Sequence, residues 1–130
     1  MVDRPIDSPN PRLPRVLVVE DEPQVRQFLD DLLTEDGFDV ATASDGHEAL
    51  GLFRQGRFDL ILTDLRMPGM DGWEMSEHLL MANPRLPIVM LTAFGSAIEH
   101  QAQARGIALL HKPVAADELA QVIRTALARR

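Results

Sequence analysis

Acidic side chains follow an apolar run at two separate places in the chain. Glu20, Asp21 and Glu22 come directly after the run VLVV, and Asp64 follows the run DLILT. If these runs form neighbouring strands, at least three carboxylates meet in one pocket, where they repel each other and take up protons unless a cation or a lysine lies beside them. Oxygen ligands without a nearby histidine suit a hard divalent ion, Mg2+ above all. The sequence therefore predicts a bound cation.

A hydroxyl group and an ammonium group follow two further apolar runs. Thr92 ends the run PIVMLT, and Lys112 follows the run IALL. In an open parallel sheet these groups would share the edge that carries the carboxylates. A metal, a carboxylate, a hydroxyl donor and a lysine together form a site for a tetrahedral oxyanion, which indicates phosphate chemistry. A carboxylate can itself be the nucleophile and form an aspartyl phosphate.

The apolar runs have the length and composition of strands that are covered on both faces. The expected strands are VLVVE after Arg15, FDVATA at 38–43, DLILT at 59–63, PIVMLT at 87–92 and a weaker IALL at 107–110. Helical spacing of apolar residues fills the gaps between them. The expected helices are one that starts near Pro23 and ends at Gly37, then 46–55, 72–82, 96–105 and a last one over 119–127.

Alternating strands and helices with short connections indicate parallel βαβ units with right-handed crossovers, and hence a three-layer α/β domain. The pattern leaves the strand order open. Helix 96–105 is mostly alanine and glutamine with one isoleucine, so we expect it to be the least stable element. Asp71 taken alone could be plain turn chemistry that caps helix 72–82. We expect Trp73 to pack that helix against the sheet.

The composition fits one globular domain of a cytoplasmic protein. The chain has 130 residues, 45% of them hydrophobic, which is enough for a single sizeable core. With 13 basic and 20 acidic residues the formal charge is −7, which argues against nucleic acid or an anionic membrane as the main partner. No cysteine is present, which excludes disulfides and thiolate nucleophiles. No apolar run approaches the roughly 20 residues of a membrane span.

Residues 1–14 differ from the rest of the chain. They hold four prolines and only four aliphatic side chains, too few apolar groups to bury and too many fixed backbone angles for a helix or a central strand. We expect a flexible Pro-rich leader over 1–14 and a folded domain over 15–130.

Four sequence blocks occur in an order and at a spacing that resemble a known family. They are VLVVEDE, LILTDLRMPGMDG, LTA and HKP. Together they resemble the receiver domain of two-component response regulators, over almost all of the chain after the leader. The joint occurrence of four blocks is specific, whereas each block alone is a weak signal. The resemblance implies a doubly wound, flavodoxin-like sheet of five parallel strands in the order 2-1-3-4-5.

The resemblance also implies roles for the acidic residues. Asp64 would be the phosphoacceptor. Asp21, Asp64 and the backbone carbonyl of Arg66 would bind Mg2+, and Glu20 would act on the ion through water. The donor of the phosphoryl group would be a histidine kinase or a histidine phosphotransfer protein.

Further roles implied by the resemblance concern the phosphoryl group itself. Thr92 and Lys112 would contact its oxygens, and the Lys112–Pro113 bond would be cis, as is usual in the family. Arg66 and Phe94 would flank the pocket, where they could tune the lifetime of the phosphorylated form by controlling the access of water.

The chain departs from the family at the switch that transmits the signal. The family usually has Tyr or Phe three residues before the lysine, and this ring turns inward when Thr92 shifts. Here the position holds Leu109, and the chain has no tyrosine, so the aromatic form of the switch cannot operate as usual. The segment GIALLHKPV resembles receivers attached to hybrid histidine kinases, where the domain often relays phosphate. The downstream target is left open.

Other interpretations stay open at this point. Glu20, Asp21 and Glu22 taken alone could simply cap the following helix. One rival function is a phosphorylation-independent, receiver-like binding module, for which Leu109 is the only indication. Another is a metal-dependent phosphatase with an aspartyl nucleophile, but such enzymes generally carry an acid two residues after the nucleophile, where this chain has Arg66. We therefore expect no true enzyme, only self-phosphorylation and slow autodephosphorylation.

Two surfaces are expected to meet protein partners. The start of the first helix around Pro23 and Arg26, with Pro113 and Val114, borders the pocket and would receive the phosphohistidine protein. Helix 96–105, the strand with Leu109 and the last helix form the candidate output face. Direct binding of nucleic acid or of a membrane is not expected.

Overall fold

The computed structural model describes residues 13–93 and 96–129 of the chain. Its elements are β1 (Arg15–Val19), α1 (Pro23–Glu35), β2 (Asp39–Ala43), α2 (Gly46–Gln55), β3 (Leu60–Asp64), α3 (Gly72–Ala82), β4 (Ile88–Thr92), α4 (Ser96–Arg105), β5 (Ala108–His111) and α5 (Ala116–Ala128). This alternation is the one that the hydrophobic pattern predicts. The expected leader, apart from Leu13 and Pro14, lies outside the described residues, and so does Phe94.

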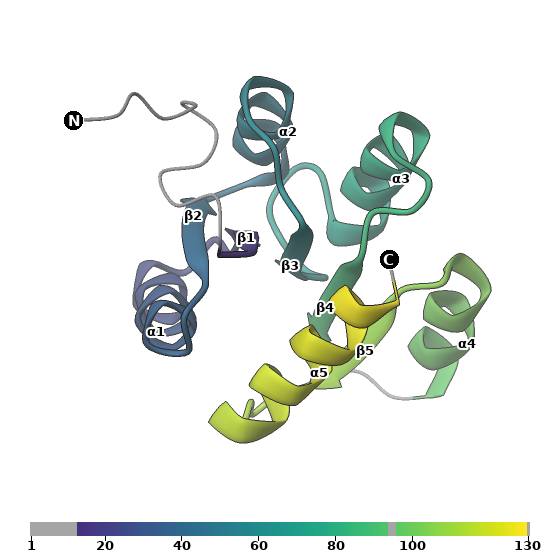
Figure 1. Cartoon of the computed structure of the whole chain (residues 1–130). Helices are drawn as coiled ribbons and strands as arrows, with labels where there is room; N and C mark the ends of the chain where they lie inside the picture. The colour runs from purple at the N-terminus through teal and green to yellow at the C-terminus, as the bar shows by residue number, and fades with distance from the viewer. Residues whose placement is uncertain (1–12, 94–95, 130) are drawn as a thin grey trace.

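The strands form one parallel sheet in the order β2-β1-β3-β4-β5 (Figure 1). The chain passes from β1 to β2, returns to β3 on the other side of β1 and then continues to β5. The direction of winding therefore reverses between β1 and β3, and parallel sheets of this kind bind ligands beyond the carboxyl ends of the strands at that point. The doubly wound, flavodoxin-like fold is confirmed.

Helices cover both faces of the sheet and give each face its own buried cluster. On one face α1 and α5 bury Leu29, Leu33 and Ile123 against the strands. On the other face α2 and α3 cover the sheet (Figure 1), and α3 buries Met75 and Leu79. Strands β3 and β4 are buried at every position, which explains why their sequences are apolar without alternation up to the polar residues at their carboxyl ends.

Local signals set the ends of two helices that border the site. The side chain of Asp71 accepts a hydrogen bond of 2.9 Å from the backbone amide of Glu74, so Asp71 caps the amino end of α3. Helix α1 begins with Pro23, whose fixed φ suits the first helical turn. After α1 the chain turns at Gly37, where φ is +93°, a value that favours glycine.

Helix α4 has little buried surface. Among its described side chains, residues 98–105, only Ala102 is buried, as its sequence predicts. Trp73 packs partly buried against the sheet cluster, and the guanidinium of Arg105 lies 4.9 Å from the centre of its ring. This contact joins α4 to α3. Within the described residues, no helix combines the length and the apolar character needed to cross a membrane.

Candidate functional site

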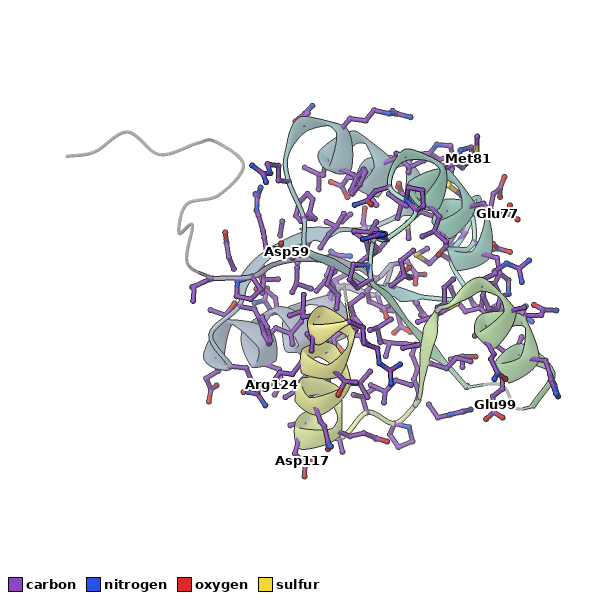
Figure 2. The ribbon with its side chains drawn as sticks, turned by 45° about the vertical axis from the view of Figure 1, so that its right-hand side comes forward. Asp59, Glu77, Met81, Glu99, Asp117 and Arg124 are labelled. Carbon is purple, nitrogen blue, oxygen red and sulfur yellow. The ribbon has the colours of Figure 1, made fainter. Side chains whose placement is uncertain are left out.

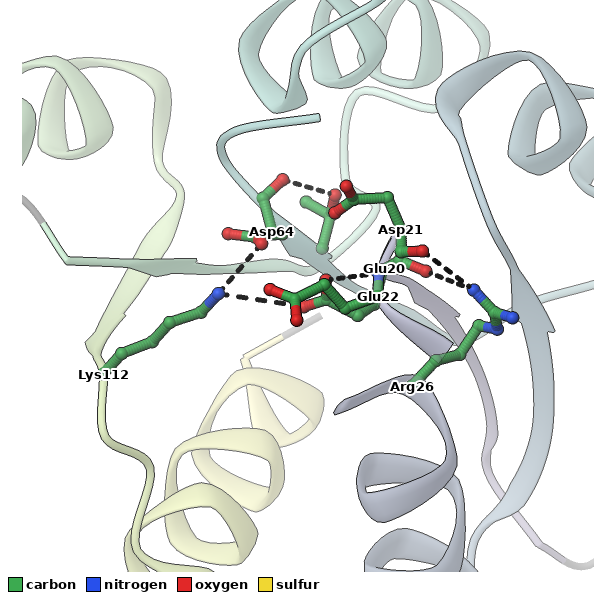
Figure 3. A network of polar contacts seen from close by, with 7 residues as sticks. Glu20, Asp21, Glu22, Arg26, Asp64 and Lys112 are labelled. Atoms are coloured by element: carbon green, nitrogen blue, oxygen red, sulfur yellow. Dashed lines mark hydrogen bonds and ion pairs between the residues drawn. The ribbon is translucent and has the colours of Figure 1, made fainter. Parts of the chain in front are cut away.

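Three carboxylates converge at the carboxyl ends of β1 and β3. The two strands are neighbours, and Val19 pairs with Thr63. Glu20 and Asp64, which follow this pair, therefore lie side by side at the carboxyl ends of the strands. Glu20, Asp21 and Asp64 each offer one carboxylate oxygen within 4.8 Å of the others (Figure 3). Three acidic groups distant in the sequence thus form one cluster, at the edge where the winding reverses.

Lys112 reaches this cluster from the loop after β5. Its Nζ donates a hydrogen bond of 2.9 Å to Asp64 Oδ2 and lies 3.8 Å from Glu20 Oε1. Lys112 is the only lysine of the chain. The peptide bond between Lys112 and Pro113 is cis. One ammonium group therefore faces two of the three carboxylates (Figure 3).

Glu20 is the most deeply buried carboxylate of the cluster. Its side chain is 1% exposed, and Oε2 accepts a hydrogen bond of 3.1 Å from the amide of Glu22. Burial raises the pKa of Glu20 from its ordinary 4.5 to about 7, and the charge of Asp64 adds to this, whereas the Glu22 amide and Lys112 oppose it. Burial alone would lower the pKa of Lys112, but the hydrogen bond and the charge of Asp64 raise it above its usual value.

The donor set fits a hard divalent cation. Glu20 Oε1 is buried and accepts no hydrogen bond from any described residue, a costly state for a carboxylate oxygen. Together with the carboxylates of Asp21 and Asp64 it provides oxygen ligands only, as Mg2+ prefers. A cation in this cluster would satisfy the buried oxygen and relieve the repulsion between the carboxylates.

The remaining residues expected at the site lie around this cluster. Thr92 is buried at the end of β4, and its carbonyl accepts a hydrogen bond of 2.9 Å from the backbone amide of Lys112. Arg66 is exposed, two residues after Asp64. Leu109 pairs with Met90 across the strands and lies partly buried in the cluster under α2 and α3. Strand β4 separates it from β3, the strand that ends in Asp64.

Two residues contact the backbone of the site in ways that the sequence did not predict. Arg26 Nη1 donates hydrogen bonds to the backbone carbonyls of Glu20 and Asp21, at 2.8 and 3.4 Å. At Gly72 an added Cβ would lie 2.6 Å from the carbonyl oxygen of Asp64. One signal for Arg26 was available, because a cation in the first turn of a helix is unfavourable without another partner. Gly72 carried no signal beyond ordinary turn chemistry.

A doubly wound parallel sheet with an acidic cluster and a lysine at the carboxyl ends of its strands has the arrangement of a receiver domain. The family model of the response regulator receiver domain matches residues 16–124. The chain belongs to this family, and it is a receiver domain of two-component signalling.

Named relatives and solved structures agree with this family. The transcriptional regulatory protein CusR of Escherichia coli K12 is 39% identical over 120 residues, which cover 88% of this chain and 52% of CusR. The chain spans about half the length of CusR and of TcrA, and about a quarter of the length of GlrR. A receiver domain protein from Clostridium thermocellum superposes with a TM-score of 0.85 at 31% identity, over 90% of this chain and 96% of that one. The response regulator TrrA of Thermotoga maritima, solved in complex with Mg2+-BeF, gives 0.81 at 32% identity, over 88% and 99%.

Proposed function

We propose that Asp64 accepts a phosphoryl group from a phosphohistidine donor. A carboxylate oxygen of Asp64 attacks phosphorus, the bond between phosphorus and the imidazole nitrogen breaks, and the imidazole leaves with the electron pair. The hydrogen bond of 2.9 Å between Lys112 Nζ and Asp64 Oδ2 is the observation that carries this proposal. It places a cation where charge accumulates on the transferring group, and positioning with electrostatic stabilisation is most of what phosphoryl transfer requires.

We assign Mg2+ binding to the acidic cluster. Asp21, Asp64 and the carbonyl of Arg66 would hold the ion directly, and Glu20 would act through water. The bound ion would neutralise charge on the phosphoryl oxygens. The separation of the three carboxylate oxygens, within 4.8 Å of one another, supports this assignment.

Thr92 and Lys112 are proposed to contact the phosphoryl oxygens. Thr92 and Lys112 are joined by a backbone hydrogen bond, so a shift of one is passed to the other. Leu109 on β5 occupies the position of the usual aromatic switch and packs with apolar side chains. We propose that the signal leaves through a repacking of Leu109 with α4, without inward rotation of a ring.

The proposal is tested by incubating the chain with acetyl phosphate and Mg2+ and measuring its intact mass. We expect one phosphate adduct in the wild type, none in Asp64→Asn, and an unchanged adduct in Asp117→Asn, which alters an exposed carboxylate of α5 (Figure 2). An adduct of equal yield in Asp64→Asn would overturn the assignment of the phosphoacceptor.

The rival functions receive no specific support. Receiver domains are in general not enzymes, and the residue two places after Asp64 is the exposed Arg66 rather than an acid. Turnover is therefore expected to be confined to the chain's own acyl phosphate. A binding module that had lost phosphorylation would have no need for a buried Glu20 beside Lys112.

The partners follow from the surfaces beside the site. We propose that a histidine kinase or a histidine phosphotransfer protein docks on the start of α1 and on the loop at Pro113 and Val114, and that α4, β5 and α5 form the output face. The named relative CusR is a transcriptional regulatory protein, whereas the attachment to a hybrid kinase stays a prediction, as does a cytoplasmic location.

A further inference from the structure

Arg26 occupies a place in α1 that is unfavourable for a cation. It is the fourth residue of the helix, and the first turn of α1 holds no acidic side chain. The amino end of a helix carries the positive end of its dipole, so a guanidinium there is repelled unless it has a strong partner elsewhere. Arg26 is also only partly exposed. Its position therefore calls for a specific acceptor.

The acceptors of Arg26 are the backbone carbonyls of the loop that carries the acidic residues. Nη1 donates to the carbonyl of Glu20 at 2.8 Å and to that of Asp21 at 3.4 Å. Figure 3 shows the guanidinium on the side of the loop opposite Lys112. Because Arg26 holds the backbone, these contacts leave the carboxylate oxygens of Glu20 and Asp21 free to face Asp64.

We infer that Arg26 is a positioning residue, which fixes the loop between β1 and α1 so that the carboxylates of Glu20 and Asp21 converge on Asp64. This inference rests on the proposed function of the cluster as a Mg2+ and phosphoryl site. It implies that loss of Arg26 impairs phosphorylation by every donor, acetyl phosphate included. Arg26 is then unsuitable as a probe of the docking surface alone.

The sign of the effect on Mg2+ binding separates positioning from simple charge. A guanidinium near an acidic cluster repels a divalent cation, so removal of its charge alone would tighten Mg2+ binding. Removal of a group that orients the ligands weakens binding instead, and such groups are typically worth tenfold or more in metal affinity. Loss of charge alone would therefore lower the Kd for Mg2+, whereas loss of a positioning group would raise it.

The experiment is a Mg2+ titration of the 15N-labelled full chain, followed through the amide signals of Asp21 and Asp64. Wild type is compared with Arg26→Gln, Arg26→Lys and the control Arg124→Gln, which removes an exposed charge from α5 (Figure 2). We expect the Kd for Mg2+ to rise about tenfold in Arg26→Gln, to rise less in Arg26→Lys, and to stay within about twofold in Arg124→Gln because distant exposed charges are screened. A Kd that is unchanged or lower in Arg26→Gln would overturn the inference.

A second measurement decides the role of Arg26 without any ion. The amide of Glu22 donates a hydrogen bond to Glu20 Oε2. In samples without Mg2+ we expect this amide to exchange with solvent several times faster in Arg26→Gln than in wild type or Arg124→Gln. Equal exchange rates would contradict a positioning role. If the wild type takes no phosphoryl group from acetyl phosphate, the proposed function fails, but this comparison still tests what Arg26 does to the loop.

Discussion

The pKa values of Glu20 and Lys112 both depend on the charges that surround them in the cluster. Glu20 is buried beside Asp64, and Lys112 is the cation that offsets both carboxylates. Burial and the charge of Asp64 raise the pKa of Glu20, whereas Lys112 lowers it. A substitution that removes one of these charges should therefore change the pKa of Glu20.

Substitution of Lys112 should change the titration of Glu20. In Lys112→Met the carboxyl loses its nearest compensating charge, so its pKa should rise above the value of about 7 that it has in the intact site. The measurement is a carboxyl 13C titration without Mg2+. Lys112→Arg keeps the charge and serves as the control, with a pKa closer to that of wild type. A pKa that falls in Lys112→Met would show that Lys112 does not lower it.

Sequence alone predicted which side chains gather at the site but only part of how they are held. Asp21, Asp64 and Lys112 could be placed together because each follows an apolar run and parallel strands share one ligand edge. The bonds from Arg26 to two carbonyls were not predictable in the same way, because their acceptors are backbone atoms and any residue type would supply them.

At the scale of the elements, the start of α3 packs directly against β3, the strand that ends in Asp64. Gly72 is its first residue, and an added Cβ would meet the Asp64 carbonyl oxygen at 2.6 Å and Leu65 Cα at 3.1 Å. Backbone atoms cannot move aside as a flexible side chain can. The start of α3 is therefore held close to Asp64 by the absence of a side chain.

Gly72→Ala should destabilise the domain by about 1–3 kcal/mol, the usual cost of overpacking. Gly51→Ala is a matched control inside α2, where an added Cβ meets nothing within 4 Å. Since glycine is a poor helix former, this control should gain about 0.5–1 kcal/mol. Urea unfolding of both variants at one pH measures the difference. Equal stabilities would mean that α3 shifts at no cost.

Trp73 is the only tryptophan of the chain, and Arg105 of α4 lies over its ring. The fluorescence of Trp73 should therefore respond to changes in the position of α4. Arg105→Gln removes the cation from the indole ring, a contact worth roughly 0.5–1 kcal/mol. We expect a changed emission intensity and faster amide exchange in α4, and neither change in Arg124→Gln. Unaltered emission would indicate that the two helices are not joined through this pair.

At the scale of the whole molecule, the raised pKa of Glu20 links stability to pH. Between pH 4.5 and about 7 the folded chain holds a proton that the unfolded chain has lost, so this group stabilises the fold at low pH and loses that effect as pH rises through the folded pKa. The pKa of Lys112 is also raised, from its ordinary 10.5. Its contribution to stability is therefore lost only in strongly alkaline solution.

Without Mg2+, the stability of wild type relative to Glu20→Gln should therefore fall by roughly 2–3 kcal/mol from pH 5 to pH 8, at ~1.4 kcal/mol per pKa unit. Added Mg2+ should stabilise the wild type more at pH 8 than at pH 5, because the cation favours the ionised carboxyl. Urea unfolding at both pH values checks this. A difference between the two chains that does not vary with pH would contradict it.

The fold itself was largely predictable. Continuous apolar runs indicate buried strands, and β3 and β4 are buried throughout. The order of the strands was available only through the resemblance to a family, because strands that are apolar on both faces carry no signal for their neighbours. The seating of α3 on Asp64 depends on three-dimensional contact between segments, which no local pattern encodes.

Because Lys112 is the only lysine of the chain, its NMR signal can be observed separately from those of all other residues. A sample isotopically enriched in this amino acid alone would carry a single side-chain nitrogen resonance, located 2.9 Å from an oxygen of Asp64. A chemical event at that oxygen would then be recorded by one peak, with no other lysine signal from this chain.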